Sequence, residues 1–171
     1  MTRPPTILTV CLGNICRSPT AEAALREAAA EAGLELEVRS AGTGGWHLGE
    51  PPDRRMRAAA ARVGLTIDGA AEQVDPVALD DADLVLAMDR SNLADLERLA
   101  ARTGSDTPIV LFREFDPAAT GSVEVPDPYY GGADGFEEVV AICRRTASVL
   151  VELLARGGID AVLAARSPVP E

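Results

Sequence analysis

Cysteine and histidine are scarce in this chain of 171 residues, which contains three cysteines and one histidine. An odd number of cysteines does not make a disulfide framework, and three cysteines with a single histidine are a poor set of zinc ligands. We therefore expect reduced thiols, no bound metal ion and no other cofactor.

Basic charge is also scarce, because 16 lysines and arginines stand against 27 aspartates and glutamates, for a net charge of −11. Such a charge repels nucleic acid and anionic membrane surfaces, so neither is an expected partner. No apolar run approaches the length of a membrane span, and the short run at residues 7–12 lacks the cleavage site of a signal peptide. We therefore expect a cytoplasmic protein.

Strand patterns alternate with helix patterns along the chain. The strand patterns are residues 6–11, 34–40, 83–87 and 108–112, and the helix patterns are residues 19–32, 54–63, 91–101 and 136–156. This alternation predicts an α/β fold in which helices cover both faces of a parallel sheet, with any site at the carboxyl ends of the strands. The length suits a single domain over residues 1–171, with a frayed tail from about residue 157.

The loop between the first strand and the first helix has the sequence CLGNICRSP. It runs from Cys11 at the end of the strand to Arg17 and Ser18, the expected N-cap of the helix. Gly13, and Asn14 with its tolerance of left-handed backbone, allow successive N–H groups to curl around one point. The helix N-terminus and the Arg17 guanidinium would then hold a tetrahedral oxyanion.

Cys11 stands beside this expected anion site. A helix N-terminus and a neighbouring guanidinium favour the thiolate, which is the nucleophilic form of cysteine. The loop lacks the Gly-Lys-Ser/Thr triplet of nucleoside triphosphate sites. The residues therefore predict attack of Cys11 on a bound phosphate. The plainer alternative is a buried cysteine at a strand end and an arginine that caps a carbonyl group.

The segment CLGNICRSP resembles the signature of the low-molecular-weight protein tyrosine phosphatases. Further matching segments follow in order: SAGT at residues 40–43, MDRSNL at 88–93, FDP at 115–117 and DPYYG at 127–131. The resemblance implies three layers, with a four-stranded parallel sheet flanked by helices and the phosphate-binding loop between the first strand and the first helix. It also implies metal-free hydrolysis of phosphotyrosine in proteins through a cysteinyl-phosphate intermediate. We expect a monomer or a weak dimer.

Asp127 is the candidate for proton transfer. One carboxyl group can protonate the leaving phenolate and later deprotonate the water that hydrolyses the intermediate. Asp127 lies between Pro126 and Pro128, which stiffen a loop beyond the fourth strand. The resemblance places the general acid at the same aspartate. Turn chemistry is the alternative interpretation of this Pro-Asp-Pro segment.

The other expected site residues form two groups. The phosphate clamp comprises, besides Arg17, the residues Leu12, Gly13, Asn14, Ile15, Cys16 and Ser18. The substrate pocket comprises Tyr129 and Tyr130 on one wall, and Trp46 and His47, with Leu12, on the opposite rim. The resemblance further implies a hydrogen-bond network of Asn14, Ser18 and Ser40 beneath the loop. For Asp89 and Ser91, a helix cap is preferred to a brace of the site.

The remaining cysteines and one glycine complete the expectations. Cys16 is expected to form a reversible disulfide with Cys11 that protects the nucleophile from overoxidation, whereas Cys143 is expected in the core. The family usually has a histidine that joins the Asn14 network, and Gly69 stands at that place. This departure leaves the rigidity of the loop open.

Three rival activities fit parts of the pattern. A thiol-dependent arsenate reductase would use the same anion site, but the resolving cysteines expected near MDRSN are absent. A protein-arginine phosphatase typically has threonine in place of Ile15 and lacks the paired tyrosines. A phosphotyrosine-binding module with a decayed site is disfavoured by the intact Cys11, Arg17 and Asp127. Protein tyrosine phosphatase is the activity that the sequence predicts.

Overall fold

A parallel sheet of four strands forms the centre of the protein in the computed structural model, which describes residues 3–130 and 133–166. The strands are, in order across the sheet, β2 (Glu37–Gly42), β1 (Thr6–Cys11), β3 (Leu84–Ala87) and β4 (Ile109–Leu111). Every pair of neighbours is parallel. All residues of the central strands β1 and β3 are buried, as expected where helices cover both faces.

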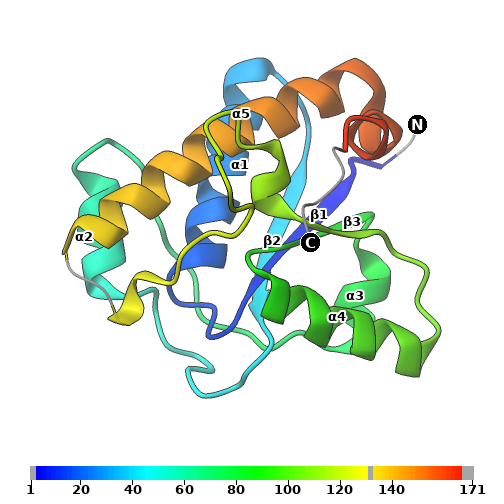
Figure 1. The fold of residues 1–171 in the computed structure, drawn as a ribbon, viewed down its shortest axis with the longest axis horizontal. Coiled ribbons are helices and arrows are strands. Elements are labelled where there is room, and N and C mark those ends of the chain that lie inside the picture. The colour runs from blue at the N-terminus through cyan, green and yellow to red at the C-terminus, as the bar shows by residue number, and fades with distance from the viewer. Residues whose placement is uncertain (1–2, 131–132, 167–171) are drawn as a thin grey trace.

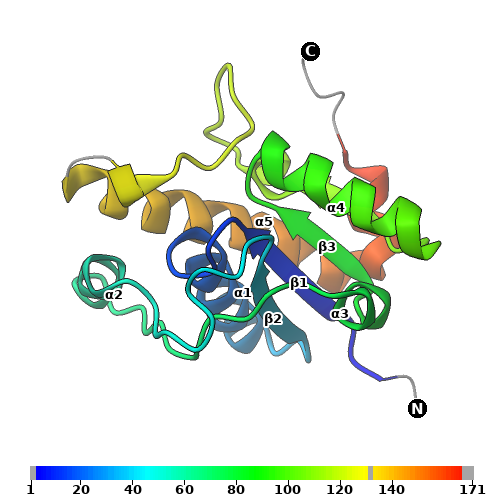
Figure 2. The ribbon, with the colours of Figure 1, turned by 90° about the horizontal axis from the view of Figure 1, so that it is seen from below.

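Helices form the two outer layers (Figures 1 and 2). One face of the sheet is covered by α1 (Arg17–Ala32) and α5 (Ala133–Ala164), with α2 (Arg54–Ala61) packed beside α5. The other face is covered by α3 (Pro76–Asp81) and α4 (Arg90–Thr103). The 3-10 helices η1 (Phe112–Phe115) and η2 (Pro128–Tyr130) lie between β4 and α5. The predicted three-layer α/β architecture is confirmed.

The core consists of two apolar layers, one on each face of the sheet. Side chains alternate along β1, so Ile7 packs in the layer under α1 and α5, whereas Leu8 and Val10 pack in the layer under α3 and α4. Cys11 continues this alternation and belongs to the first layer. The pleat of β1 therefore places the Cys11 side chain on the α1 side of the sheet, at the carboxyl end of the strand.

Ser18 and Ser91 do not cap the helices that they were predicted to cap, whereas the cap predicted at Asp89 is confirmed. Helix α1 begins at Arg17, with Cys16 at the N-cap position and no side-chain cap, so Ser18 lies inside the first turn. Helix α4 is capped by Asp89, whose carboxylate accepts a hydrogen bond from the backbone N–H of Asn92 at 2.8 Å, and not by Ser91.

Helix α5 extends beyond its predicted end at residue 156. The chain kinks at Gly157 and Gly158, which both have non-helical backbone angles, and the helix then continues to Ala164. Val162 is fully buried, and Arg166 pairs with Glu114 of η1 at 3.0 Å. These contacts hold the C-terminal segment, so the expected fraying does not begin at residue 157. Residues 167–171 lie outside the described part of the chain.

No helix in the described ranges 3–130 and 133–166 is long and apolar enough to span a membrane.

Candidate active site

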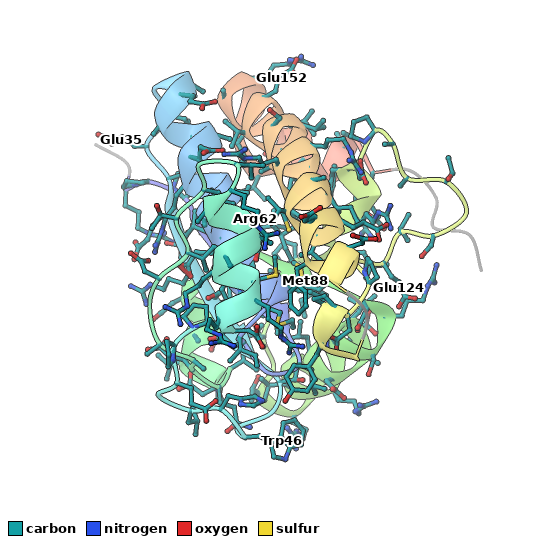
Figure 3. All side chains as sticks on the ribbon, turned by 90° about the vertical axis from the view of Figure 1, so that its left-hand side faces the viewer. Glu35, Trp46, Arg62, Met88, Glu124 and Glu152 are labelled. Atoms are coloured by element: carbon teal, nitrogen blue, oxygen red, sulfur yellow. The ribbon has the colours of Figure 1, made fainter. Side chains whose placement is uncertain are left out.

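A pocket with a volume of about 430 Å³ opens at the carboxyl end of β1. Three separate segments line it: Cys11, Leu12, Gly13, Ile15, Cys16 and Arg17 from the loop, Trp46 and His47 from the segment after β2, and Asp127 and Tyr129 from the segment before α5. Figure 3 shows Trp46 at the corresponding end of the molecule, opposite Glu35 and Glu152. The structure thus brings most of the predicted site residues together, although the side chain of Tyr130 lies outside the described part.

Asn14 shapes the phosphate-loop backbone. Its φ angle is +57°, the left-handed value that asparagine tolerates better than most residues. Its side-chain amide donates to the hydroxyl groups of Ser18 at 2.8 Å and Ser40 at 3.0 Å, and its side-chain oxygen accepts from the backbone N–H of Glu72 at 2.8 Å. The network of Asn14, Ser18 and Ser40 is therefore present and holds the loop against two other segments.

Carbonyl groups of the loop are engaged by neighbouring segments. The carbonyl oxygens of Cys11, Leu12 and Ile15 accept hydrogen bonds from the backbone N–H groups of residues 43, 44 and 53 at 2.8–2.9 Å. The first N–H groups of α1 have no acceptor within the helix, as at any helix N-terminus. This arrangement suits binding of a tetrahedral anion by backbone N–H groups.

The Cys11 sulfur lies among hydrogen-bond donors. The backbone N–H of Asn14 donates to Cys11 Sγ at 3.3 Å, and Ser18 Oγ lies 3.0 Å from the same atom. Because Asn14 donates to Ser18 Oγ, the hydroxyl hydrogen of Ser18 is left for an acceptor, and the sulfur is nearer than the Ala41 carbonyl at 3.3 Å. These donors can stabilise negative charge on the sulfur of Cys11.

Arg17 is buried and bonded on several sides. Its Nη1 donates to Asp89 Oδ2 at 2.6 Å and to the carbonyl oxygen of Val125 at 3.2 Å, and its Nη2 lies 3.6 Å from Asp127 Oδ2. Burial would lower the pKa of Arg17, but Cys11 and the carboxylates of Asp89 and Asp127 outweigh it and raise the pKa above the usual value. The guanidinium therefore stays charged beside the Cys11 thiol.

Two further residues support the loop: Asp89, for which the sequence favoured only a cap, and Gly42, which sequence reasoning missed. Asp89 caps α4 through Oδ1, as preferred, but its Oδ2 also holds Arg17. A Cβ atom at Gly42, the last residue of β2, would lie 2.7 Å from the carbonyl oxygen of Leu12, so this position requires glycine. The brace that the sequence left as the alternative for Asp89 is therefore also present, although its partner Arg17 lies 72 residues away.

Asp127 lies where the two sides of the pocket mouth approach each other. Its Oδ1 accepts from the backbone N–H of Tyr129 at 3.0 Å, and its side chain is about one-third exposed. The Tyr129 ring faces the His47 ring at a centroid distance of 6.4 Å. His47 Nδ1 in turn lies 2.6 Å from Glu50 Oε2. The Asp127 segment and the segment after β2 thus meet over the phosphate loop.

Glycines support the aromatic rim. The Trp46 side chain is mostly exposed, yet its ring lies so close to Gly44 that a Cβ atom there would be 1.9 Å from the ring. A Cβ atom at Gly13 would lie 3.0 Å from Cδ2 of His47. Gly13 therefore favours the close approach of His47, whereas the left-handed turn of the loop belongs to Asn14.

Comparison with known proteins assigns the family. Residues 6–159 match the sequence profile described as low molecular weight phosphotyrosine protein phosphatase. The chain belongs to this family. The low molecular weight protein-tyrosine-phosphatase of Streptomyces coelicolor is 46% identical to it over 145 residues, which are 83% of this chain and 88% of that protein.

Solved structures of the low molecular weight phosphatase family have the same fold. The protein tyrosine phosphatase of Entamoeba histolytica matches with a TM-score of 0.82 and 33% identity, over 90% of this chain and 98% of that one. A Drosophila arginine phosphatase matches with a TM-score of 0.79 and 29% identity, over 85% and 95%. The same fold therefore occurs in a tyrosine phosphatase and in an arginine phosphatase. The choice between these two substrates must come from the residues of the pocket.

Gly69 takes the place of the histidine that is usual in the low molecular weight phosphatase family. Its φ angle is +100°, which side chains rarely adopt, so a histidine would be strained there. The Asn14 side chain is nevertheless fully bonded, because its oxygen accepts from the backbone N–H of Glu72. The loop of this family member is thus braced without the imidazole.

The remaining cysteines of this family member are free and buried. Burial, together with the carboxylate of Asp53, raises the pKa of Cys16, which lines the pocket. Burial also raises the pKa of Cys143, which packs in the core. The predicted core position of Cys143 is confirmed. The Cys11–Cys16 disulfide remains a prediction.

Proposed function

We propose that the chain hydrolyses phosphotyrosine in proteins, with Cys11 as nucleophile, Arg17 and the loop backbone as phosphate clamp, and Asp127 as general acid and base. One observation supports this proposal: the side chains of Cys11, Arg17 and Asp127 line the same pocket. Two hydrogen-bond donors lie next to the Cys11 sulfur, and the charged Arg17 guanidinium lies near it. Membership of the low molecular weight phosphotyrosine phosphatase family supports it.

In the first step the phosphate group binds to the loop N–H groups and Arg17. The Cys11 thiolate attacks phosphorus, so the S–P bond forms as the bond to the tyrosine oxygen breaks. Asp127 transfers its proton to the leaving oxygen. Arg17 and the N-terminus of α1 stabilise the charge that develops on the transferring group.

In the second step a water molecule hydrolyses the intermediate. The Asp127 carboxylate removes a proton as the water oxygen attacks phosphorus, and the S–P bond breaks. The electron pair returns to the Cys11 sulfur, where the Ser18 hydroxyl and the Asn14 N–H can stabilise it. Phosphate and the free enzyme result.

The aromatic rim supports a phosphotyrosine substrate. Tyr129 and Trp46 line the pocket together with the apolar side chains of Leu12 and Ile15. A flat aryl ester can pass between such side chains and place its phosphorus over Cys11. A serine ester is shorter, so its peptide backbone would meet the rim before the phosphate reached the loop.

A panel of four substrates tests this function on the metal-free enzyme: phosphotyrosine, phosphoserine and phosphoarginine peptides of one sequence, and arsenate with thiol reductants. We expect the phosphotyrosine peptide to exceed the other two peptides in kcat/KM by roughly 10- to 200-fold, the scale that pocket contacts usually provide. Arsenate should bind competitively but be reduced poorly, because the resolving cysteines of an arsenate reductase are absent near residues 88–93. Fast phosphoarginine hydrolysis or arsenate reduction with slow phosphotyrosine cleavage would replace the proposed function.

Ile15→Thr tests what separates this pocket from an arginine phosphatase. Ile15 lines the pocket as an apolar side chain, so a threonine hydroxyl is expected to shift the ratio of kcat/KM values towards the phosphoarginine peptide. The matched control is Ile15→Val, which keeps the branched shape and should leave the ratio unchanged. An identical ratio in both variants would show that the selectivity lies elsewhere in the pocket.

Mild peroxide is expected to inactivate the enzyme reversibly through a Cys11–Cys16 disulfide, with dithiothreitol restoring activity. Oxidation starts at the thiolate, and the intermediate formed on Cys11 condenses with a nearby thiol. Peptide mapping by mass spectrometry identifies the bond. In Cys16→Ser, activity should instead be lost irreversibly. Equal recovery of the wild type and this variant would remove Cys16 from its proposed role.

We further propose that the chain acts as a single catalytic domain in the cytoplasm, as a monomer or a weak dimer. The catalytic role of a free Cys11 requires a reducing compartment, which supports the location. The net charge of −11 disfavours nucleic acid and anionic membrane as partners.

A further inference from the structure

Arg55 is a charged residue near the pocket that the proposed reaction does not use. It lies in the first turn of α2, and Figure 3 shows this helix beside the start of α5, with Arg62 just beyond its C-terminal end. The Arg55 guanidinium lies over two rings: its Cζ is 4.8 Å from the ring centre of Phe136 in α5 and 5.5 Å from that of Tyr129. Arg55 therefore connects a buried ring of the core to a ring of the pocket wall.

Asp53 fixes the guanidinium in this position. Its two carboxylate oxygens accept from Nε and Nη2 of Arg55 at 3.2 and 3.0 Å, and the same carboxylate caps α2 by accepting from the backbone N–H of Arg55 at 2.8 Å. Burial would raise the pKa of Asp53, but the hydrogen bonds from Arg55 and from the helix outweigh it and lower the pKa. Hydrogen bonds from the Arg55 side chain and from the backbone at the start of α2 thus hold the Asp53–Arg55 ion pair in place.

The start of α2 is itself tied to the phosphate loop. The backbone N–H of Asp53 donates to the carbonyl oxygen of Ile15 at 2.8 Å. Arg55 therefore has a defined position relative to the loop that holds Cys11. On the other side, Tyr129 is two residues from Asp127, and its backbone N–H donates to Asp127 Oδ1 at 3.0 Å.

We propose that Arg55 is a positioning residue for Asp127: by holding the Tyr129 ring, it sets the distance between the proton donor and the phosphate loop. This inference rests on the proposed phosphatase function. The residue does not touch the reacting atoms; it acts through Tyr129. Among the described residues, the other ionic partner of the Asp127 carboxylate is Arg17 at 3.6 Å. Proton transfer depends on placement within hydrogen-bond distance, so support from Tyr129 matters.

The experiment compares Arg55→Gln with Arg54→Gln, since Arg54 is the exposed neighbour in the same helix. We expect Arg55→Gln to lower kcat/KM for phenyl phosphate by roughly 2- to 5-fold, the range of one cation–π contact at an exposed side chain. The loss should be smaller for p-nitrophenyl phosphate, whose leaving group needs less protonation. Arg54→Gln should match the wild type on both substrates. Arg55→Lys keeps the charge but loses the planar fork, so its kcat/KM for phenyl phosphate should lie between those of Arg55→Gln and Arg54→Gln.

A double-mutant cycle with Tyr129→Leu separates positioning from a general loss of stability. If Arg55 acts through Tyr129, the effects of the two substitutions on the leaving-group dependence will not add. Equal loss on both substrates in Arg55→Gln, or full additivity in the double variant, would overturn the proposal. Inorganic phosphate affinity, measured by calorimetry, should be unchanged in all variants, and a large loss would likewise overturn it by placing Arg55 in the phosphate clamp.

The two proposals fail in distinguishable ways. If the wild type hydrolyses aryl phosphates but Arg55→Gln behaves as Arg54→Gln, the positioning role is wrong and the function stands. If the wild type hydrolyses no aryl phosphate although it binds phosphate, the proposed function is wrong, and the role of Arg55 falls with it.

Discussion

Cys11→Ser is expected to reduce turnover of a phosphotyrosine peptide to below roughly one ten-thousandth of the wild-type rate. The serine hydroxyl keeps almost the same shape but is a far weaker nucleophile at neutral pH. The contacts that stabilise charge on the sulfur, from Ser18 and the Asn14 N–H, would have no thiolate to stabilise. A discontinuous assay for released phosphate measures the loss.

The same variant should still bind inorganic phosphate, within roughly tenfold of the wild-type affinity, because the clamp consists of backbone N–H groups and Arg17. Calorimetry measures this binding, and unchanged thermal unfolding would show that the fold is intact. Cys16→Ser is the matched control, since this second pocket cysteine should be dispensable for turnover. Near wild-type turnover in Cys11→Ser would place the nucleophile elsewhere.

Asp127→Asn is expected to lower kcat/KM for phenyl phosphate by roughly 10²- to 10⁴-fold, because the amide cannot donate the proton that the phenolate needs. For p-nitrophenyl phosphate the loss should be much smaller. The dependence of the rate on the leaving group therefore becomes steeper in the variant, and a series of substituted aryl phosphates measures the slope.

Asp106→Asn is the control for this experiment, because Asp106 is an exposed carboxylate before β4. It should leave both the rate and the slope unchanged. The substitution at Asp127 also removes a negative charge 3.6 Å from Arg17, which should strengthen phosphate binding slightly. An equal loss of rate for good and poor leaving groups would argue against the acid role and would indicate that Asp127 only orients Arg17.

Much of the phosphate loop could be predicted from the sequence because its geometry is local. An apolar strand that ends at Cys11, an asparagine that adopts φ +57°, and a helix that runs from Arg17 to Ala32 with Gly33 as its C-cap all lie within residues 6–33. Short-range steric preferences determine such a unit. The same local patterns gave the parallel α/β architecture, since alternating strands and helices have few alternative packings.

Pairings between distant segments could not be predicted in this way. Asp89 carried the local signal of a helix cap, and only the fold brings its second oxygen to within 2.6 Å of Arg17. Ser18 carried the signal of an N-cap, but α1 begins two residues earlier than predicted, and the Ser18 hydroxyl contacts Cys11 instead. A side chain with several possible partners takes those that packing brings closest, and this choice is not encoded in its own neighbours.

The sequence by itself determined which groups are the candidates for the chemistry: a cysteine and an arginine on one loop, and an aspartate between two prolines. Only the tertiary structure decided how these groups are held, through Asp89 on Arg17, Gly42 under the loop, and Arg55 against Tyr129. The physical reason is the separation along the sequence over which each kind of interaction acts. Backbone preferences act over a few residues, whereas ion pairs and ring contacts form between any segments that the buried core brings together.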